Sequence, residues 1–206
     1  MTADLSTTGP AALRRSPLAH LTEALRAATV TGPRAVALAE WPCAVMVNLR
    51  VDPASPAAVR IEKVLGAALP ARCGRTASAG SGTTLWLGPD EWLVVAPPGA
   101  PARTAELAAA LAGEPGSVVD VSANRTVLEL RGPAARQVLE KGCPLDLHPR
   151  VFGRGQAVST LVGPVPVILW QTGGDSYRLL PRSSFADHLA RWLMDAMSEY
   201  ALPEVD

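Results

Sequence analysis

Asp120, Val121 and Ser122 form the most suggestive polar group in the sequence, because they directly precede a predicted strand. An acid and a hydroxyl at the entry of a strand usually accept hydrogen bonds from the backbone of a local turn. The same two side chains could instead line a ligand cavity. We therefore keep Asp120 and Ser122 as candidate cofactor-binding residues, with both interpretations open.

Three further residues are candidates for contact with a partner protein. Arg182 precedes the last predicted helix, where its charge meets the positive end of the helix dipole unfavourably. An acidic partner or ligand could be held there, and an exposed arginine without a role is the alternative. The chain has five tryptophans against two phenylalanines, and exposed tryptophans often anchor interfaces. We expect most of the five in the core, with Trp41 and Trp92 as the candidate exceptions.

The histidines predict no metal or catalytic site. His20, His148 and His188 are far apart in the sequence, and none has a second ligand at metal-binding spacing. The glycine-rich nucleotide-binding motifs, GxSxG and HExxH are all missing from the sequence. We expect neither a catalytic residue nor a metal on this chain.

The cysteines are typical of a reduced, cytoplasmic protein. Cys43, Cys73 and Cys143 are scattered without a CxxC spacing. Cys143 follows a predicted helix end near Lys141, a neighbour that could favour a reactive thiolate. A small buried residue is the ordinary occupant of such a position, and the sequence favours that structural interpretation.

The charge balance argues against a nucleic-acid partner. Basic and acidic residues number 19 each in 206 residues, for a formal net charge of zero. Binding to nucleic acid or to an anionic membrane requires clustered Lys and Arg. No basic flank followed by an apolar run opens the chain, and no stretch of about 18 apolar residues occurs. We expect a cytoplasmic protein that does not span a membrane.

The elements that would position these residues repeat along the chain. The first half predicts a strand, a helix with Val59, Val64, Leu65 and Ala68 as its apolar face, a loop, a hairpin and a second helix. These segments are 44–51, 55–69, 72–84, 85–96 and 102–112. Residues 113–117 are the predicted joint between the halves.

The second half predicts the same order of elements. A strand, a helix, a hairpin and a long helix are expected at 125–131, 132–142, 165–180 and from 183 onward. The last helix carries a core-facing stripe of Phe185, Leu189, Trp192, Leu193, Ala196, Met197 and Tyr200. The hairpins match most closely, since Gly88, Asp90 and Trp92 correspond to Gly173, Asp175 and Tyr177.

This repetition indicates an α+β fold of two β-α-β-β-α units, related by a pseudo-two-fold and packed into one domain. We expect the domain to span 16–202, with halves at about 35–113 and 117–202. Residues 1–15 are expected to be disordered. A short helix opening at Ser16 and Pro17, with Leu18, Leu21 and Leu25 on one face, either packs on its own domain or docks onto another chain.

Several of these segments resemble a known family. The strings Val119–Ser122 and Thr126–Leu130, followed by Gly132 and Pro133, resemble aminomethyltransferase-like, folate-binding domains. Within that superfamily the chain is most similar to the gamma subunit of heterotetrameric sarcosine oxidase. The strings that carry this similarity are Trp86–Leu93, Lys141–Pro149 and Arg182–Phe185, and it extends over about residues 16–200.

The resemblance implies a complex of alpha, beta, gamma and delta chains. Such a complex oxidises sarcosine to glycine, forms hydrogen peroxide and delivers the one-carbon unit to tetrahydrofolate. FAD, FMN, NAD and the tetrahydrofolate site would belong to the other subunits, with no cofactor on the gamma chain. Whether the substrate is sarcosine or a related N-methyl amine stays open.

One departure from the superfamily concerns an acidic pair. Folate-using relatives carry two acids in the strand after the second helix, where this chain has the apolar segment Gly163–Trp170. Valine and isoleucine cannot carry a proton in general acid–base work. We therefore expect a subunit for structure and assembly. The alternatives are a stand-alone, folate-binding one-carbon transferase and a folate-sensing module.

Overall fold

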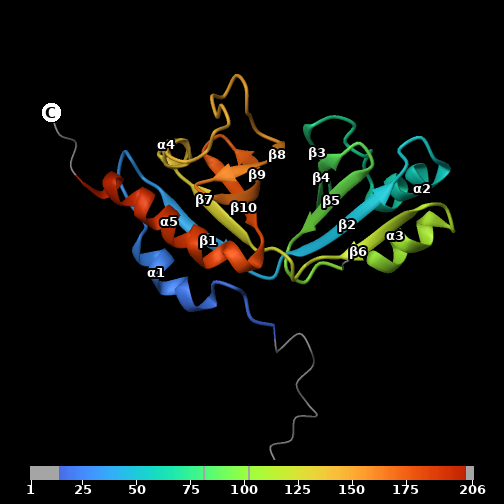
Figure 1. Ribbon diagram of the computed structural model, residues 1–206, viewed down its shortest axis with the longest axis horizontal. Coiled ribbons are helices and arrows are strands. Elements are labelled where there is room, and N and C mark those ends of the chain that lie inside the picture. Colours follow the sequence, from blue (N-terminus) through green and yellow to red (C-terminus); the bar gives the residue numbers. More distant parts are fainter. Residues whose placement is uncertain (1–13, 81, 102, 203–206) are drawn as a thin grey trace, which may run out of the picture.

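The strands of the computed structural model, which describes residues 14–80, 82–101 and 103–202, form one strongly curled sheet. Their order is β1-β7-β10-β9-β8-β3-β4-β5-β2-β6, and each neighbouring pair in the ladders is antiparallel. The helices cover the outer side of the curl (Figure 1). Disorder was predicted for residues 1–15. Of these, residues 1–13 lie outside the described chain.

The first half of the sheet runs from β3 to β6. Its elements are β2 (Val45–Val51), α2 (Pro56–Leu65), β3 (Gly74–Ala79), β4 (Gly82–Gly88), β5 (Glu91–Ala96), α3 (Thr104–Leu111) and β6 (Gly116–Asp120). The strand β6 pairs with β2 and forms one edge of the sheet. The first half therefore continues to Asp120, beyond the joint predicted at 113–117.

The second half runs from β8 to β1 and includes the start of the described chain. Its elements are η3 (Ala19–Leu21), α1 (Thr22–Ala27), β1 (Ala37–Trp41), β7 (Val127–Arg131), α4 (Ala135–Glu140), β8 (Gln156–Val162), β9 (Val165–Gly173), β10 (Ser176–Pro181), η4 (Ser183–Phe185), α5 (Ala186–Ser198) and η5 (Glu199–Ala201). The strand β1 pairs with β7, not with the half that follows it in sequence.

Strand order is the same in the two halves. The first reads β3-β4-β5-β2-β6 and the second β8-β9-β10-β7-β1, with β3 and β8 paired where the halves meet. Each half therefore holds five strands, two more than predicted, because β3 and β6 in the first half and β8 and β1 in the second were not expected. The loop predicted at 72–84 is wrong, because β3 and the start of β4 form a hairpin there. Small and polar residues dominate that segment, so it lacks the apolar alternation that marks a half-buried strand.

The apolar face predicted for α2 is confirmed in part, because Val64 and Leu65 pack against the core of the first half. Ala57, Ala58 and Ile61 are buried, whereas Val59 is 67% exposed. The helix thus turns its alanines and Ile61 to the core and the bulkier Val59 to solvent. The predicted start is confirmed, because the Ser55 hydroxyl accepts a hydrogen bond from the Ala58 N–H at 3.3 Å. The helix ends earlier than predicted, at Leu65, since Gly66 is left-handed.

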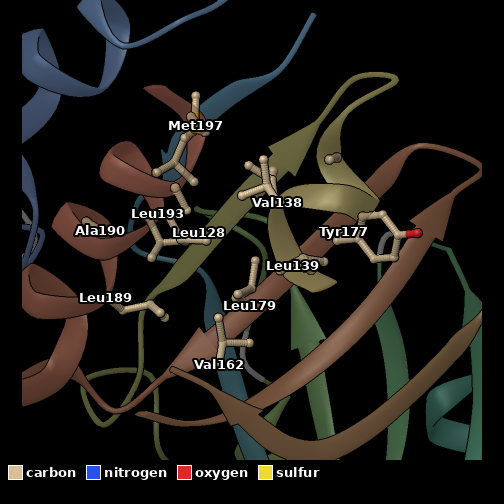
Figure 2. Close-up of a cluster of buried hydrophobic side chains, with 14 of the residues drawn as sticks. Leu128, Val138, Leu139, Val162, Tyr177, Leu179, Leu189, Ala190, Leu193 and Met197 are labelled. Atoms are coloured by element: carbon tan, nitrogen blue, oxygen red, sulfur yellow. The ribbon is translucent and has the colours of Figure 1, made fainter. Parts of the chain in front are cut away.

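The core stripe of the last helix is confirmed for most of its members. Figure 2 shows Leu189, Leu193 and Met197 of α5 facing side chains of β7, β10 and α4. Phe185 departs from the stripe, because it lies in η4 before α5 begins and is 44% exposed.

The N-terminal helical segment packs on its own domain. Leu18, Leu21 and Leu25 are buried in the core of the second half, which selects the first of the two predicted alternatives. The His20 ring nitrogen lies 2.7 Å from the Asp187 carboxylate at the start of α5, so a polar contact also ties this segment to the last helix.

A third hydrophobic cluster lies between the two halves of the sheet. Met46 and Leu85 of the first half pack with Ile168, Trp170 and other residues of the second. Strand β9 has its two faces in different cores, with alternate residues such as Val167 and Leu169 turned to the helices. A strand buried on both faces needs an almost continuous apolar sequence, which explains the composition of 163–170.

Candidate functional site

A cavity of about 490 Å³ lies beside the connection between the halves. One wall is the start of the described chain, at residues 14–17, and another is the turn from Asp120 to Thr126. Its charged and hydroxyl-bearing lining residues are Arg14, Arg15, Ser16, Asp120, Ser122, Arg125, Thr126 and Ser183. The size is in the range of small-molecule sites.

Asp120 and Ser122 line this cavity and also build the turn. The Asp120 Oδ1 accepts hydrogen bonds from the Ser122 N–H at 2.9 Å and from the Ser122 hydroxyl at 2.6 Å. These two bonds hold the pKa of Asp120 below its ordinary value. The Ser122 Oγ in turn accepts a hydrogen bond from the Met46 N–H at 3.0 Å. The local structural role is thus visible, and a cofactor-binding role stays a prediction.

Glu40 of β1 connects the two walls of the cavity. The hydroxyls of Ser16 and Thr126 both donate to its carboxylate, the second at 2.6 Å. This link joins the start of the described chain to the residues that open β7. Nothing in the sequence around Glu40 signals the contact, because its partners are distant along the chain.

Arg182 is exposed and lies opposite Arg125 in an isolated antiparallel bridge. Arg125 is half-buried and donates from Nη1 to the Leu180 carbonyl at 2.9 Å. Burial, and after it the charge of Arg182, lowers the pKa of Arg125. Both arginines line a second cavity, of about 320 Å³, together with Pro166 and Phe185. The sequence analysis did not single out Arg125, because it is an ordinary residue at the start of the strand predicted at 125–131.

Trp92 is wrong as a candidate for partner contact. Its side chain is 1% exposed, and its indole N–H donates to the Pro70 carbonyl at 2.9 Å. Trp41 is half-buried, and the Arg178 guanidinium lies 4.0 Å from its ring centre and 5.1 Å from that of Trp170. Cation–π stacking thus accounts for the position of Trp41 within its own domain.

Cys143 and Lys141 do not form a reactive pair. The Cys143 thiol is buried, with the Thr160 hydroxyl 3.9 Å away. Lys141 instead pairs with the Glu199 carboxylate at 3.1 Å and donates to the Ala196 carbonyl. These contacts support the structural interpretation of the cysteine.

Metal ligands do not gather in the part of the chain that the structure describes. No group of three or more His, Cys, Asp or Glu side chains there could hold an ion. The described helices are too short or too polar for any of them to cross a membrane.

Comparison with protein families and curated proteins gives a consistent result. The model of the "Sarcosine oxidase, gamma subunit family" matches residues 49–199. The sarcosine oxidase subunit gamma of an Arthrobacter species is 50% identical over 94% of this chain and 94% of its own length. That of Corynebacterium sp. strain U-96 is 50% identical with the same coverage.

Solved structures resemble the fold at two levels. A chain of the heterotetrameric sarcosine oxidase from Corynebacterium sp. U-96, in complex with pyrrole 2-carboxylate, aligns with a TM-score of 0.90 and 49% identity. It covers 94% of this chain and all of the solved chain. Aminomethyltransferase T of the glycine cleavage system from Bartonella henselae aligns with a TM-score of 0.62 and 19% identity, over 88% of this chain and 57% of its own. The second likeness concerns the fold alone.

Proposed function

The chain belongs to the sarcosine oxidase gamma subunit family, and we propose that it is a non-catalytic subunit that holds larger chains of the oxidase together. The reaction of the assembled enzyme would be the oxidation of sarcosine to glycine, with hydrogen peroxide and 5,10-methylenetetrahydrofolate as further products. The partners would be the alpha, beta and delta subunits.

The observation that carries the non-catalytic role is the environment of β9. Its side chains alternate between two buried clusters, with Val167 on the helix side and Ile168 between the halves. A carboxylate in either place would lose its hydration without a partner, which costs several kcal/mol. The central residues of the strand, 167–170, therefore offer no position for an acid that could transfer a proton.

The larger cavity supplies no general acid for folate chemistry either. Asp120 is its carboxylate, and the oxygen Oδ1 is engaged by two hydrogen bonds within the turn. Its lowered pKa keeps it charged at neutral pH, so it cannot act there as a general acid. We accordingly propose that FAD, FMN, NAD and tetrahydrofolate are bound by the other subunits.

We further propose that the halves are two units of the aminomethyltransferase folate-binding type, related by a pseudo-two-fold. The matching strand orders on either side of the β3–β8 contact support this relation, as does the likeness in fold to aminomethyltransferase T. In this view β1 occupies in the second half the place that β6 has in the first.

Co-expression with the alpha, beta and delta chains tests the proposal. We expect the gamma chain to elute with them in size-exclusion chromatography, and the complex made without it to lose subunits or oxidase activity. The purified gamma chain should turn over neither sarcosine nor a one-carbon adduct. Normal assembly and activity in its absence would contradict the structural role, and turnover by the single chain would contradict the non-catalytic one.

A folate-binding transferase is the second candidate, favoured by the cavity beside Asp120. It predicts that the isolated chain binds tetrahydrofolate and that Asp120→Asn weakens the binding. Isothermal titration calorimetry distinguishes the candidates, because the structural proposal expects no heat of binding with either variant.

A further inference from the structure

Two arginines face each other without an acid between them. Arg125 and Arg182 form an isolated antiparallel bridge, flanked by hydrogen bonds from the Ser183 N–H to the Asn124 carbonyl and from the Thr126 N–H to the Pro181 carbonyl. This pattern makes them a non-hydrogen-bonded pair, the kind whose side chains lie closest together on one face of the ladder. Like charges at such positions are destabilising, so a negative group between them would relieve a cost that the chain itself leaves in place.

The surrounding surface extends this charge. Arg14 and Arg15 line the cavity that Arg125 shares. Within the described ranges none of these arginines forms an ion pair with an acid, and Asp120 acts on Arg14 only at longer range. Some arginines elsewhere do have such partners, as Arg60 has in Glu114 at 2.7 Å. What distinguishes this surface is that its arginines cluster around two cavities that share Arg125.

The two cavities share a wall at Arg125, and the second has an apolar end. Arg125 lines both the 490 Å³ and the 320 Å³ cavity. In the second cavity Pro166 and Phe185 accompany Arg182, and Phe185 is 44% exposed although it belongs to a helical turn beside the core. An exposed aromatic side chain next to unpaired arginines is the composition that protein interfaces favour.

We propose that this arginine groove, formed by Arg14, Arg15, Arg125, Arg182, Pro166 and Phe185, receives an acidic segment of a partner subunit of the oxidase. The inference rests on the proposed function, because it needs an assembled complex. The segment would place a carboxylate between Arg125 and Arg182 and an apolar side chain against Phe185. A single small anion would satisfy the arginine pair but would leave the first cavity and the Phe185 ring uncovered, so the extended segment fits more of the surface.

The test uses charge reversal at the exposed end of the groove. Tagged gamma variants compete with the wild-type gamma chain for the co-expressed alpha, beta and delta chains, with Arg182→Glu as the test and the exposed Arg72→Glu as the control. We expect Arg182→Glu to weaken binding at least about tenfold, whereas Arg72→Glu stays within about twofold. The double variant Arg182→Glu with Phe185→Asp should weaken it by about a hundredfold. Should Arg182→Glu fail to fold by circular dichroism, Arg182→Gln takes its place with a smaller expected loss.

Salt supplies an independent measurement. Raising NaCl from about 50 mM to 300 mM should weaken the wild-type interaction more than that of Arg182→Glu, because screening removes an attraction that the variant has already lost. Equal affinities for Arg182→Glu and Arg72→Glu would overturn the groove as a docking site while leaving the subunit role intact. Failure of the wild-type chain to bind would overturn the subunit role itself.

A free anion as the occupant has its own signature. Inorganic phosphate or citrate would then raise the melting temperature of the isolated gamma chain, Arg182→Glu would abolish that rise, and both variants would join the complex normally. That combination would also overturn the proposal. Loss of complex formation by Arg182→Glu, without any effect of phosphate or citrate on the isolated chain, would support it.

Discussion

The two halves share a strand order but differ in what covers their sheets. In the first half α2 presents Ala57, Ala58 and Ile61 to the sheet, and Arg60 binds the end of α3 through the Ala110 carbonyl at 2.8 Å. In the second half α5 presents a stripe of large side chains, and α1 and α4 complete the cover. Figure 1 shows the first half flanked by α2 and α3, and the second by α1, α4 and α5.

This difference shows that one sheet topology accepts two kinds of packing. The side of α2 that faces the core carries mostly alanines, whereas the leucines and methionine of α5 bury more apolar area. The second half also recruits η3, α1 and β1 from the other end of the chain, so its core is the larger one. We expect the stability of the whole domain to depend more strongly on the second half.

The largest expected effect is a loss of stability when one buried leucine in each half is replaced by alanine. Leu193 on α5 and Leu107 on α3 are both fully buried. Leu193→Ala should lower the free energy of unfolding by about 4 kcal/mol and Leu107→Ala by about 2.5 kcal/mol, because the helix over the alanine-rich core can collapse further into the space. Urea unfolding monitored by circular dichroism measures both. Equal losses would mean that the halves do not differ in this way.

The second-largest effect is expected at Gly142, where the backbone lies close to Trp192 and Gly163 of the second half. A Cβ on Gly142 would lie 2.6 Å from Trp192 Cζ2 and 2.9 Å from the Gly163 backbone nitrogen. Gly142→Ala should therefore destabilise the second half by about 2 kcal/mol through forced displacement of these neighbours. Gly174→Ala is the matched control, since nothing lies within 4 Å of its Cβ position. Thermal unfolding should separate the two variants, and identical melting temperatures would refute the expected clash.

The connection between the halves can be weakened without touching either core. Ser122→Ala removes the acceptor for the buried Met46 N–H of β2. An unsatisfied buried donor should lower the free energy of unfolding by about 1–2 kcal/mol. The exposed Ser159→Ala serves as control and should change it little. Guanidinium titrations followed by tryptophan fluorescence report the difference, and no loss in Ser122→Ala would mean that water replaces the hydroxyl.

The smallest expected effect is a pH dependence at the start of α5. Hydrogen bonds from Arg191 and His20 hold the pKa of Asp187 below its ordinary value of 3.8. A carboxylate with a lowered pKa in the folded state contributes stability above about pH 4, and this contribution is lost as the pH falls through the folded-state value. Asp187→Asn should therefore flatten the acid side of the stability profile below about pH 5. Superimposable profiles would indicate that this surface contact contributes nothing.

The sequence predicted most elements but not their number or their partners. The helix ends at Ser55 and Gly142 follow local capping and turn chemistry, so they could be predicted from the neighbouring residues. The strands β1, β3, β6 and β8 were missed, because none of them carries a clear apolar alternation. Their identity as strands depends on pairing with partners that are distant along the chain, as in β1 with β7 and β3 with β8, or on the neighbouring strands β4, β9 and β2.

The candidate site was predicted in part. Asp120 and Ser122 stand next to each other in the sequence, and their turn chemistry was recognisable there. The contributions of Arg14, Glu40 and Arg125 were not, because they come from segments that meet only after the sheet has closed. Trp92 failed as a surface candidate because aromatic content alone cannot tell a core position from an exposed one.

The amino-acid sequence by itself determined the α+β class, the doubled order of elements, the apolar stripe of the last helix and the family. Each of these depends on residue types within one segment, where hydrophobic periodicity and turn residues act locally. Only the tertiary structure decided that β1 joins the second half, that β3 meets β8 and that Arg125 faces Arg182. Pairings between distant segments depend on which strand edges remain free after the others have paired, and no single segment carries that information.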